Sequence, residues 1–170
     1  AVLQHVGKMP VKIHVTFPHL SCSKLDVIHD GASLAAGEID KIHGSHSLIL
    51  RHPTTSELST TLKGNKERVP TSEGCTISGT LRPQMVAGVL SVGLNRQAWT
   101  AATGALSMAL MDASNQRTKG NLQRHFNVSH YVHSVQFGKQ FGKQKDRPLE
   151  RLSHMIDNNY LGIAVAQTQV

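Results

Sequence analysis

The chain is poor in cysteine and in aromatic residues. Only 2 of its 170 residues are cysteines, and only 4% are aromatic. Two cysteines permit one internal disulfide, but cytosolic domains also carry buried thiols, so their number does not decide the compartment. So few aromatic rings leave little for stacking against nucleic-acid bases.

Long hydrophobic runs are also missing. No stretch reaches the roughly 18 uncharged apolar residues that a membrane helix needs. The nearest, residues 98–113, is interrupted by polar positions such as Thr103 and Asp112. The sequence starts at Ala1 without a cleavable signal pattern, so we expect an excised soluble region, which a membrane-anchored parent could contain.

The overall composition is that of one folded domain. Hydrophobic residues make up 39% of the chain and charged residues only 17%, which argues against disorder. A length of 170 residues suits a single domain with a core of its own.

The net charge of +7 is unevenly distributed. Residues 86–170 contain nine Lys and Arg against four Asp and Glu, so this half holds +5 of the +7. A basic half favours an acidic partner, an anionic membrane surface or nucleic acid. Because the basic residues are scattered and aromatic residues are few, a basic soluble β protein that binds RNA or a ribonucleoprotein is only the alternative interpretation.

Motifs for catalysis are absent from the sequence. It contains no Gly-x-Ser-x-Gly nucleophile elbow and no Gly-x-x-x-x-Gly-Lys-Ser/Thr phosphate loop. Neither cysteine belongs to a Cys-x-x-Cys pair, which argues against disulfide exchange. We therefore predict no catalytic residues, no cofactor and no enzymatic activity.

Histidine is abundant, with 11 residues, and one close pair in a polar stretch has a spacing typical of metal ligands. This pair is His43 and His46, with Asp40 nearby. No thiolate lies near enough in sequence to complete a zinc site. We therefore expect exposed loop histidines and no metal site.

Short apolar stretches that alternate with polar residues predict a chain built mainly of strands. The expected strands are Val11–Val15, Leu25–Ile28, Ser47–Leu50, Thr76–Leu81, Val86–Val92 and Leu161–Val165. The fourth and fifth are close in sequence and are expected to form a hairpin. Only Gln97–Ser114 has apolar residues at helical spacing, and the polar stretch His52–Ser72 predicts a loop. The predicted fold class is all-β, an antiparallel β-sandwich with one short helix and long polar loops.

The segment Phe126–Gly138 is the most informative part of the sequence. In its first part the apolar residues stand at even-numbered positions (Phe126, Val128, Val132), and in its second part at odd-numbered positions (Val135, Phe137). This pattern indicates a strand whose buried face changes midway, at a bulge or where both faces are covered. Three polar residues, Asn127, His130 and His133, lie within it, and each needs a hydrogen-bond partner if it is buried.

Three further segments join this one to form an ordered set. They are Val15–Cys22, which runs through Phe-Pro into a cysteine, Gly74–Leu81 with the following Val86-Ala87-Gly88, and Pro148–Glu150 with the later His154–Asp157. In order and spacing, the four resemble the ERGIC or endoplasmic-reticulum-vesicle protein family of ER–Golgi cargo receptors. The resemblance extends from Lys12 to Ala166 and is closest to the cysteine-poor branch. Val89, Leu90 and Ser91 depart from the family pattern, which has an Asn and an aromatic-His pair there.

The resemblance implies a lumenal β-sandwich domain over residues 12–170, with 1–11 as an N-terminal extension. It implies cargo binding or assembly in a membrane receptor that cycles in coated vesicles between endoplasmic reticulum, intermediate compartment and Golgi. The implied partners are a related family subunit, in a hetero-oligomer, and lumenal cargo proteins. An oxidising lumen would favour a disulfide between Cys22 and Cys75.

Two further kinds of site are expected in the strand Phe126–Gly138. Asn127-Val128-Ser129 is the only N-glycosylation sequon of the chain. His130 and His133 are either structural residues, hydrogen-bonded within the sheet, or a titrating pair that senses pH in the range in which secretory compartments differ.

Overall fold

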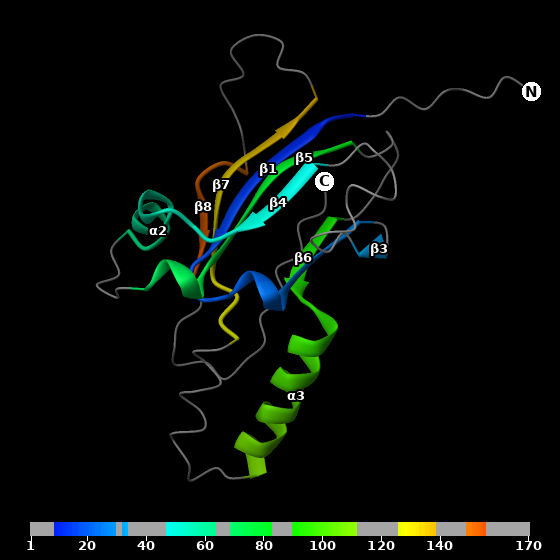
Figure 1. The fold of residues 1–170 in the computed structure, drawn as a ribbon, viewed down its shortest axis with the longest axis vertical. Coiled ribbons are helices and arrows are strands. Elements are labelled where there is room, and N and C mark those ends of the chain that lie inside the picture. The colour runs from blue at the N-terminus through cyan, green and yellow to red at the C-terminus, as the bar shows by residue number, and fades with distance from the viewer. Residues whose placement is uncertain are drawn as a thin grey trace, which may run out of the picture.

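The computed structural model describes residues 9–29, 32–33, 47–63, 69–82, 90–111, 126–138 and 149–155. Within them, strands form two antiparallel sheets that pack against each other (Figure 1). The larger sheet has the order β4 (Ser47–Arg51), β5 (Cys75–Leu81), β1 (Val11–Phe17), β7 (His130–Phe137), β8 (Leu152–His154). The smaller has the order β3 (Ala32–Ser33), β2 (Leu25–His29), β6 (Leu90–Leu94). The predicted antiparallel β-sandwich is confirmed.

The core lies between the two sheets. Ile13 and Phe17 of β1 and Ile77 of β5 point into it from the larger sheet, and Leu25 and Val27 of β2 meet them from the smaller one. These residues share the core side because every second residue of a strand points to the same face of the sheet. Ile77 and Val27 are fully buried, and burial of one such side chain stabilises the fold by about 1.5–3 kcal/mol.

The pairing of β5 and β6 differs from the prediction. The sequence predicts a hairpin of these two strands, but β5 pairs with β4 and β1, and β6 pairs with β2 in the other sheet. The hairpin prediction is therefore wrong. Both edges of β5 are already occupied in the larger sheet, whereas β6 completes the smaller one. The final strand expected at Leu161–Val165 lies outside the described residues.

Strand β7 contains the predicted change of face. His14 of β1 pairs with Ser134, and the next residue, Val15, pairs with Val132, so His133 is an extra residue in β7. This is a β-bulge, which shifts the alternation of the strand by one residue. Of the two explanations that the sequence left open, the bulge is confirmed.

A short helix, α2 (Thr55–Thr61), occupies part of the stretch predicted to be a loop. It lies against the side of the larger sheet that faces away from the smaller sheet (Figure 1). Its N-terminus forms a capping box, in which the Thr54 side chain accepts from the Glu57 backbone and the Glu57 side chain accepts from the Thr54 backbone. Two single-turn 3₁₀ helices, η1 (Cys22–Lys24) and η2 (Thr71–Glu73), also connect strands.

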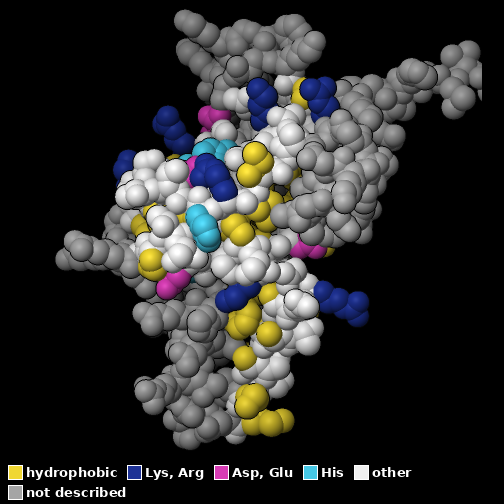
Figure 2. Space-filling model, in the orientation of Figure 1, with side chains coloured by type: hydrophobic (Ala, Val, Ile, Leu, Met, Phe, Trp, Pro, Cys, Tyr) yellow, Lys and Arg dark blue, Asp and Glu magenta, His cyan; other side chains and the backbone are white. Residues whose placement is uncertain are grey.

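The predicted helix is confirmed as α3 (Arg96–Met111). Asn95 caps it by accepting from Ala98 N–H at 2.8 Å, and Asn95 Nδ2 donates to Ser23 O in η1 at 2.6 Å. From this attachment α3 extends away from the sheets, and apolar side chains follow it to its end (Figures 1 and 2). None of the helices in the described parts of the chain is long and apolar enough to cross a membrane.

Candidate functional site

The outer face of the larger sheet, which points away from the core, is polar. In β1, Val11 and Ile13 enter the core, so Lys12, His14 and Thr16 point to the outer face. Helix α2 covers the end of this face that contains Thr16. The side chains gathered between helix and sheet, which we call the α2 polar layer, are His14, Thr16, Arg51, Glu57, Thr76 and His133.

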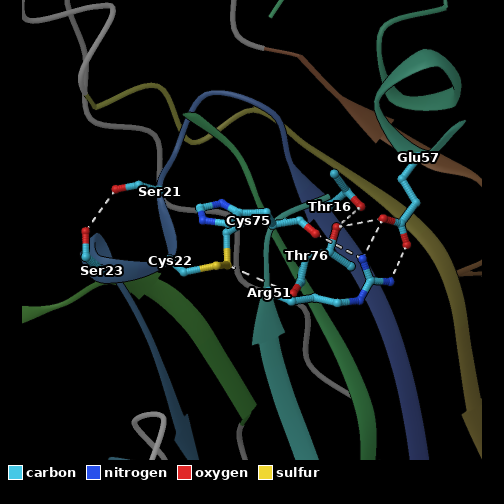
Figure 3. Close-up of a disulfide and its surroundings, with 9 residues drawn as sticks. Thr16, Ser21, Cys22, Ser23, Arg51, Glu57, Cys75 and Thr76 are labelled. Carbon is cyan, nitrogen blue, oxygen red and sulfur yellow. Dashed lines mark hydrogen bonds and ion pairs between the residues drawn. A yellow bond between two sulfur atoms is a disulfide. The ribbon is translucent and has the colours of Figure 1, made fainter. Parts of the chain in front are cut away.

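Glu57 is the acceptor on which the α2 polar layer converges (Figure 3). Arg51 donates twice to its carboxylate, at 2.7 Å to Oε1 and 2.9 Å to Oε2. The Thr54 N–H donates to Oε2 at 2.7 Å, and His14 Nε2 lies 2.8 Å from Oε1. Thr76 Oγ1 donates to Oε2 at 3.3 Å. These donors surround a residue that is only 8% exposed, so the charge of Glu57 is compensated within the protein.

The donors around Glu57 set its protonation state. Burial alone would raise the pKa of this carboxyl, but the hydrogen bonds from Arg51, Thr54 N–H and His14, together with the positive charge of Arg51, outweigh it. They hold the pKa of Glu57 well below its ordinary value. Glu57 is therefore a carboxylate at neutral pH and can only accept hydrogen bonds.

The carboxylate fixes the direction of a hydrogen-bond chain across three strands. Thr76 Oγ1 uses its proton to donate to Glu57, so it accepts from Thr16 Oγ1, 2.8 Å away. Thr16 has then used its own proton, so it accepts from His133 Nε2 at 2.9 Å. His133 is therefore the Nε2–H tautomer when neutral, and His14 is too, because its Nε2 faces the carboxylate directly. Both Nδ1 atoms remain as the positions at which an added proton would bind.

The bulge brings His133 against His14. Their rings stack with centroids 4.3 Å apart, and the Tyr131 ring meets His133 edge-on at 4.8 Å. Burial lowers the pKa of His133, and the neighbouring charges of His14 and Arg51 lower it further, against an opposing effect of Glu57. Without the bulge, His133 would point to the opposite face from its neighbour Ser134, which pairs with His14, and could not stack on His14.

His130 lies in a different environment from His133. Its ring contacts Phe17, whose side chain belongs to the core, at 5.4 Å, and stacks on His154 of β8 at 5.6 Å. Its Nδ1 lies 3.1 Å from Val128 O. Burial is the main cause that lowers the pKa of His130. The structure thus places the two histidines on opposite faces of the sheet and gives each a different histidine partner.

Cys22 and Cys75 form a disulfide, with Cα atoms 4.9 Å apart (Figure 3). Cys22 begins η1, which leads directly into β2 of the smaller sheet, and Cys75 begins β5 of the larger sheet. The bond therefore links the two sheets at one end of the sandwich. On the chain-entropy model, closing this loop stabilises the fold by roughly 4 kcal/mol.

Asn127 and Ser129 form a tight local turn before β7. Asn127 Oδ1 accepts from the Ser129 N–H at 2.8 Å and from the Ser129 hydroxyl. Asn127 is half-buried, whereas Ser129 is only 2% exposed. The carbonyl end of the Asn127 amide is thus bound to the backbone, which leaves Nδ2, the atom that a glycan would modify, on the other side.

Of the six residues of the α2 polar layer, sequence reasoning singled out only His133 and missed the other five: His14, Thr16, Arg51, Glu57 and Thr76. The Thr54-x-x-Glu57 spacing was the available signal, since it is a capping-box pattern. Nothing local points to His14 or Arg51, because register and helix placement bring them to Glu57. His43 and His46 lie outside the described residues, within which no group of three or more His, Cys, Asp or Glu could hold a metal ion.

The fold and site define a disulfide-linked β-sandwich with a polar layer, which contains two histidines, under a short helix. The family model of the endoplasmic reticulum vesicle transporters matches residues 52–166, and the chain belongs to this family. It is thus a protein of vesicle transport between endoplasmic reticulum and Golgi.

Among solved structures, the crystal structure of Erv41p is similar in fold, with a TM-score of 0.52 and 12% sequence identity. The similarity covers 92% of this chain and 68% of that one. No curated protein matches the sequence.

Proposed function

We propose that this chain is the lumenal domain of a membrane receptor of ER–Golgi vesicles, and that it binds cargo proteins or a related subunit. The observation that carries the proposal is the Cys22–Cys75 disulfide in a member of an ER vesicle transporter family. Disulfides persist in oxidising compartments, and the lumen is the oxidising side of the ER membrane. Cys75 is fully buried, so the bond is part of the core rather than an exposed, exchangeable pair.

The side of the membrane can be tested by protease protection. The full-length parent protein, tagged next to this domain, is expressed in cells, and sealed microsomes are treated with protease with and without detergent. We expect the domain to be degraded only with detergent, and to migrate faster on a non-reducing gel until the disulfide is reduced. Degradation in intact microsomes would place the domain in the cytosol and contradict the proposal.

Binding of partners needs a separate experiment. The tagged parent protein is purified in mild detergent from cells that carry its natural partners, and co-purifying proteins are identified by mass spectrometry. We expect a related family subunit in stoichiometric amount and lumenal proteins in smaller amount. If RNA-binding proteins or RNA were recovered instead, the alternative expected from the basic composition would be favoured.

A lumenal position also makes Asn127 a candidate glycosylation site. A glycan on Nδ2 leaves Oδ1 free to accept from Ser129, so the turn before β7 is compatible with modification. Because Ser129 is buried, the sequon is accessible only before folding. We expect a glycosidase-sensitive mass shift for the wild type and none for Asn127→Gln, whereas Asn95→Gln, outside any sequon, keeps it. An unshifted wild type would show that the sequon is not used.

A further inference from the structure

Helix α2 is held on the sheet mainly by polar contacts. Leu58 is the only apolar residue among its seven residues, and the remaining buried positions are Glu57 and Thr61. The Thr61 hydroxyl donates to Glu57 O within the helix. The position of α2 therefore depends on the hydrogen bonds that Glu57 accepts from the sheet, and on the absence of competing water.

The stacked pair of His14 and His133 lies at the centre of this contact. Other charged or titratable groups face the pair from each neighbouring element: Arg51 from β4, Glu57 from α2, Tyr131 from β7 and Lys12 from β1, two residues before His14 on the same face. Glu57 is the carboxylate that His14 contacts, and Arg51 already shares it.

The two rings cannot take up protons independently. Two imidazolium cations with centroids 4.3 Å apart repel each other, even though the His14 side chain is 32% exposed and water screens part of the repulsion. His14 Nε2 already contacts the Glu57 carboxylate directly. A proton on His133 is opposed by the positive charges of His14 and Arg51, and the link of His133 to Glu57 runs through two threonine hydroxyls.

We propose that α2 is a proton-operated lid, which opens when His133 is protonated beside His14 and exposes the row Arg51–Thr76–Thr16–Tyr131 of the outer face. With α2 raised, more water reaches the two rings and weakens the repulsion that a charged His133 meets. The open state thus binds more protons than the closed state, so acidification shifts the population toward it. Burial, above all, lowers the pKa of His133 in the closed state. A lower pKa in the closed state means that acidification favours the open state, as the proposal requires. This opening of α2 does not require any particular binding partner of the domain.

The opening of α2 can be measured by amide hydrogen exchange between pH 7 and pH 5. The amides of Leu58 and Leu62 report on α2, since they donate to Thr54 O and Leu58 O at 3.0 and 2.8 Å. Amides of β5 report on global unfolding. After correction for the chemical exchange rate, we expect the α2 opening constant to increase as pH falls, by up to tenfold per pH unit for one proton. The β5 amides should change less.

Variants separate the lid from general acid sensitivity. In His133→Gln the pH response of α2 should be lost while β5 remains protected, which shows that the variant is folded. His130→Gln is the matched control, because His130 lies in the same strand on the other face, and it should keep the α2 response. His14→Gln removes the repelling neighbour and should shift α2 opening to lower pH. A wild-type response in His133→Gln, an unshifted response in His14→Gln, or joint opening of α2 and β5 at every pH would overturn the proposal.

Discussion

The hydroxyl groups of Thr16 and Thr76 lie 2.8 Å apart at directly paired positions of β1 and β5, and both residues are fully buried. Through this contact the carboxylate on α2 determines which nitrogen of His133, in β7, carries the proton. A threonine pair across two strands thus connects a helix to a strand that it does not hydrogen-bond directly.

Replacing Thr16 by Val keeps the shape of the side chain but removes this connection. His133 Nε2–H then loses its acceptor and Thr76 loses its donor, so we expect the free energy of unfolding to fall by about 1–3 kcal/mol. Urea unfolding at pH 7.5 measures the loss. Thr80→Val, on the same face of β5 but beyond α2, is the control and should change stability by less than about 0.5 kcal/mol. Equal effects of the two substitutions would argue against the hydrogen-bond chain that runs from Glu57 through Thr76 and Thr16 to His133.

Glu57→Gln tests the centre of the α2 polar layer. The amide carries no charge and brings two donors of its own to a position surrounded by donors, so Arg51 and His14 are left with poorer partners. We expect a loss of about 1–3 kcal/mol in urea unfolding, a moderate range because Arg51 remains 38% exposed. Glu73→Gln, at an exposed carboxylate in η2, should be nearly neutral.

Simultaneous replacement of Cys22 and Cys75 by Ser removes the link between the sheets. The two residues are 53 positions apart, so the chain-entropy model predicts a loss of about 4 kcal/mol. Reduction of the wild type should give a similar loss in urea unfolding. A midpoint that does not move on reduction would show that packing alone fixes the two sheets.

Gly79 of β5 lies where a side chain has no room. Its φ is +144°, and a Cβ atom there would collide with the Ser47 carbonyl in β4. We expect Gly79→Ala to destabilise the fold by about 3 kcal/mol through backbone strain and steric overlap. Gly93→Ala in β6 is the matched control, because its Cβ would meet no atom within 4 Å, and it should stabilise slightly. Thermal unfolding of both variants distinguishes the two positions.

The features that the sequence predicted correctly are those that local patterns encode. The change of phase within Phe126–Gly138 announces the bulge at His133, and the alanines of α3 recur at helical spacing. Helix α2 was missed because its sequence, TSELSTT, has one apolar residue and weak helix formers. Its capping box and its contact with the sheet compensate for that weakness.

The site could not be predicted because its contacts are not local. His14 and Glu57 are 43 residues apart and Thr16 and His133 are 117 apart. Only strand order and register bring them together, and the partner of a strand depends on which edges are free, as the failed hairpin prediction for β5 and β6 shows. For the same reason His130 and His133, three residues apart, end in separate environments.

The stability of the domain should decrease on mild acidification, with His130 as one source. Burial lowers the pKa of His130 in the folded state, and the charge of the neighbouring His154 acts in the same direction. The unfolded chain therefore binds more protons once the pH falls below the unfolded value of about 6.5, and folding is penalised there but not well above it. Glu57 does not contribute to this decrease in stability. Because its pKa is lowered in the folded state, the stabilisation that its carboxylate provides is lost only when the pH falls below the ordinary pKa of glutamate.

The urea midpoint between pH 8 and pH 5 measures this effect. We expect the wild-type midpoint to fall toward pH 5, and that of His130→Gln to fall less, because Gln cannot take up the proton. Asn95, half-buried at the start of α3, does not titrate, so Asn95→Gln should lower the midpoint by the same amount at every pH and controls for general destabilisation. If wild type and His130→Gln gave parallel pH profiles, His130 would be a structural residue, held between Phe17 and His154 without a titrating role.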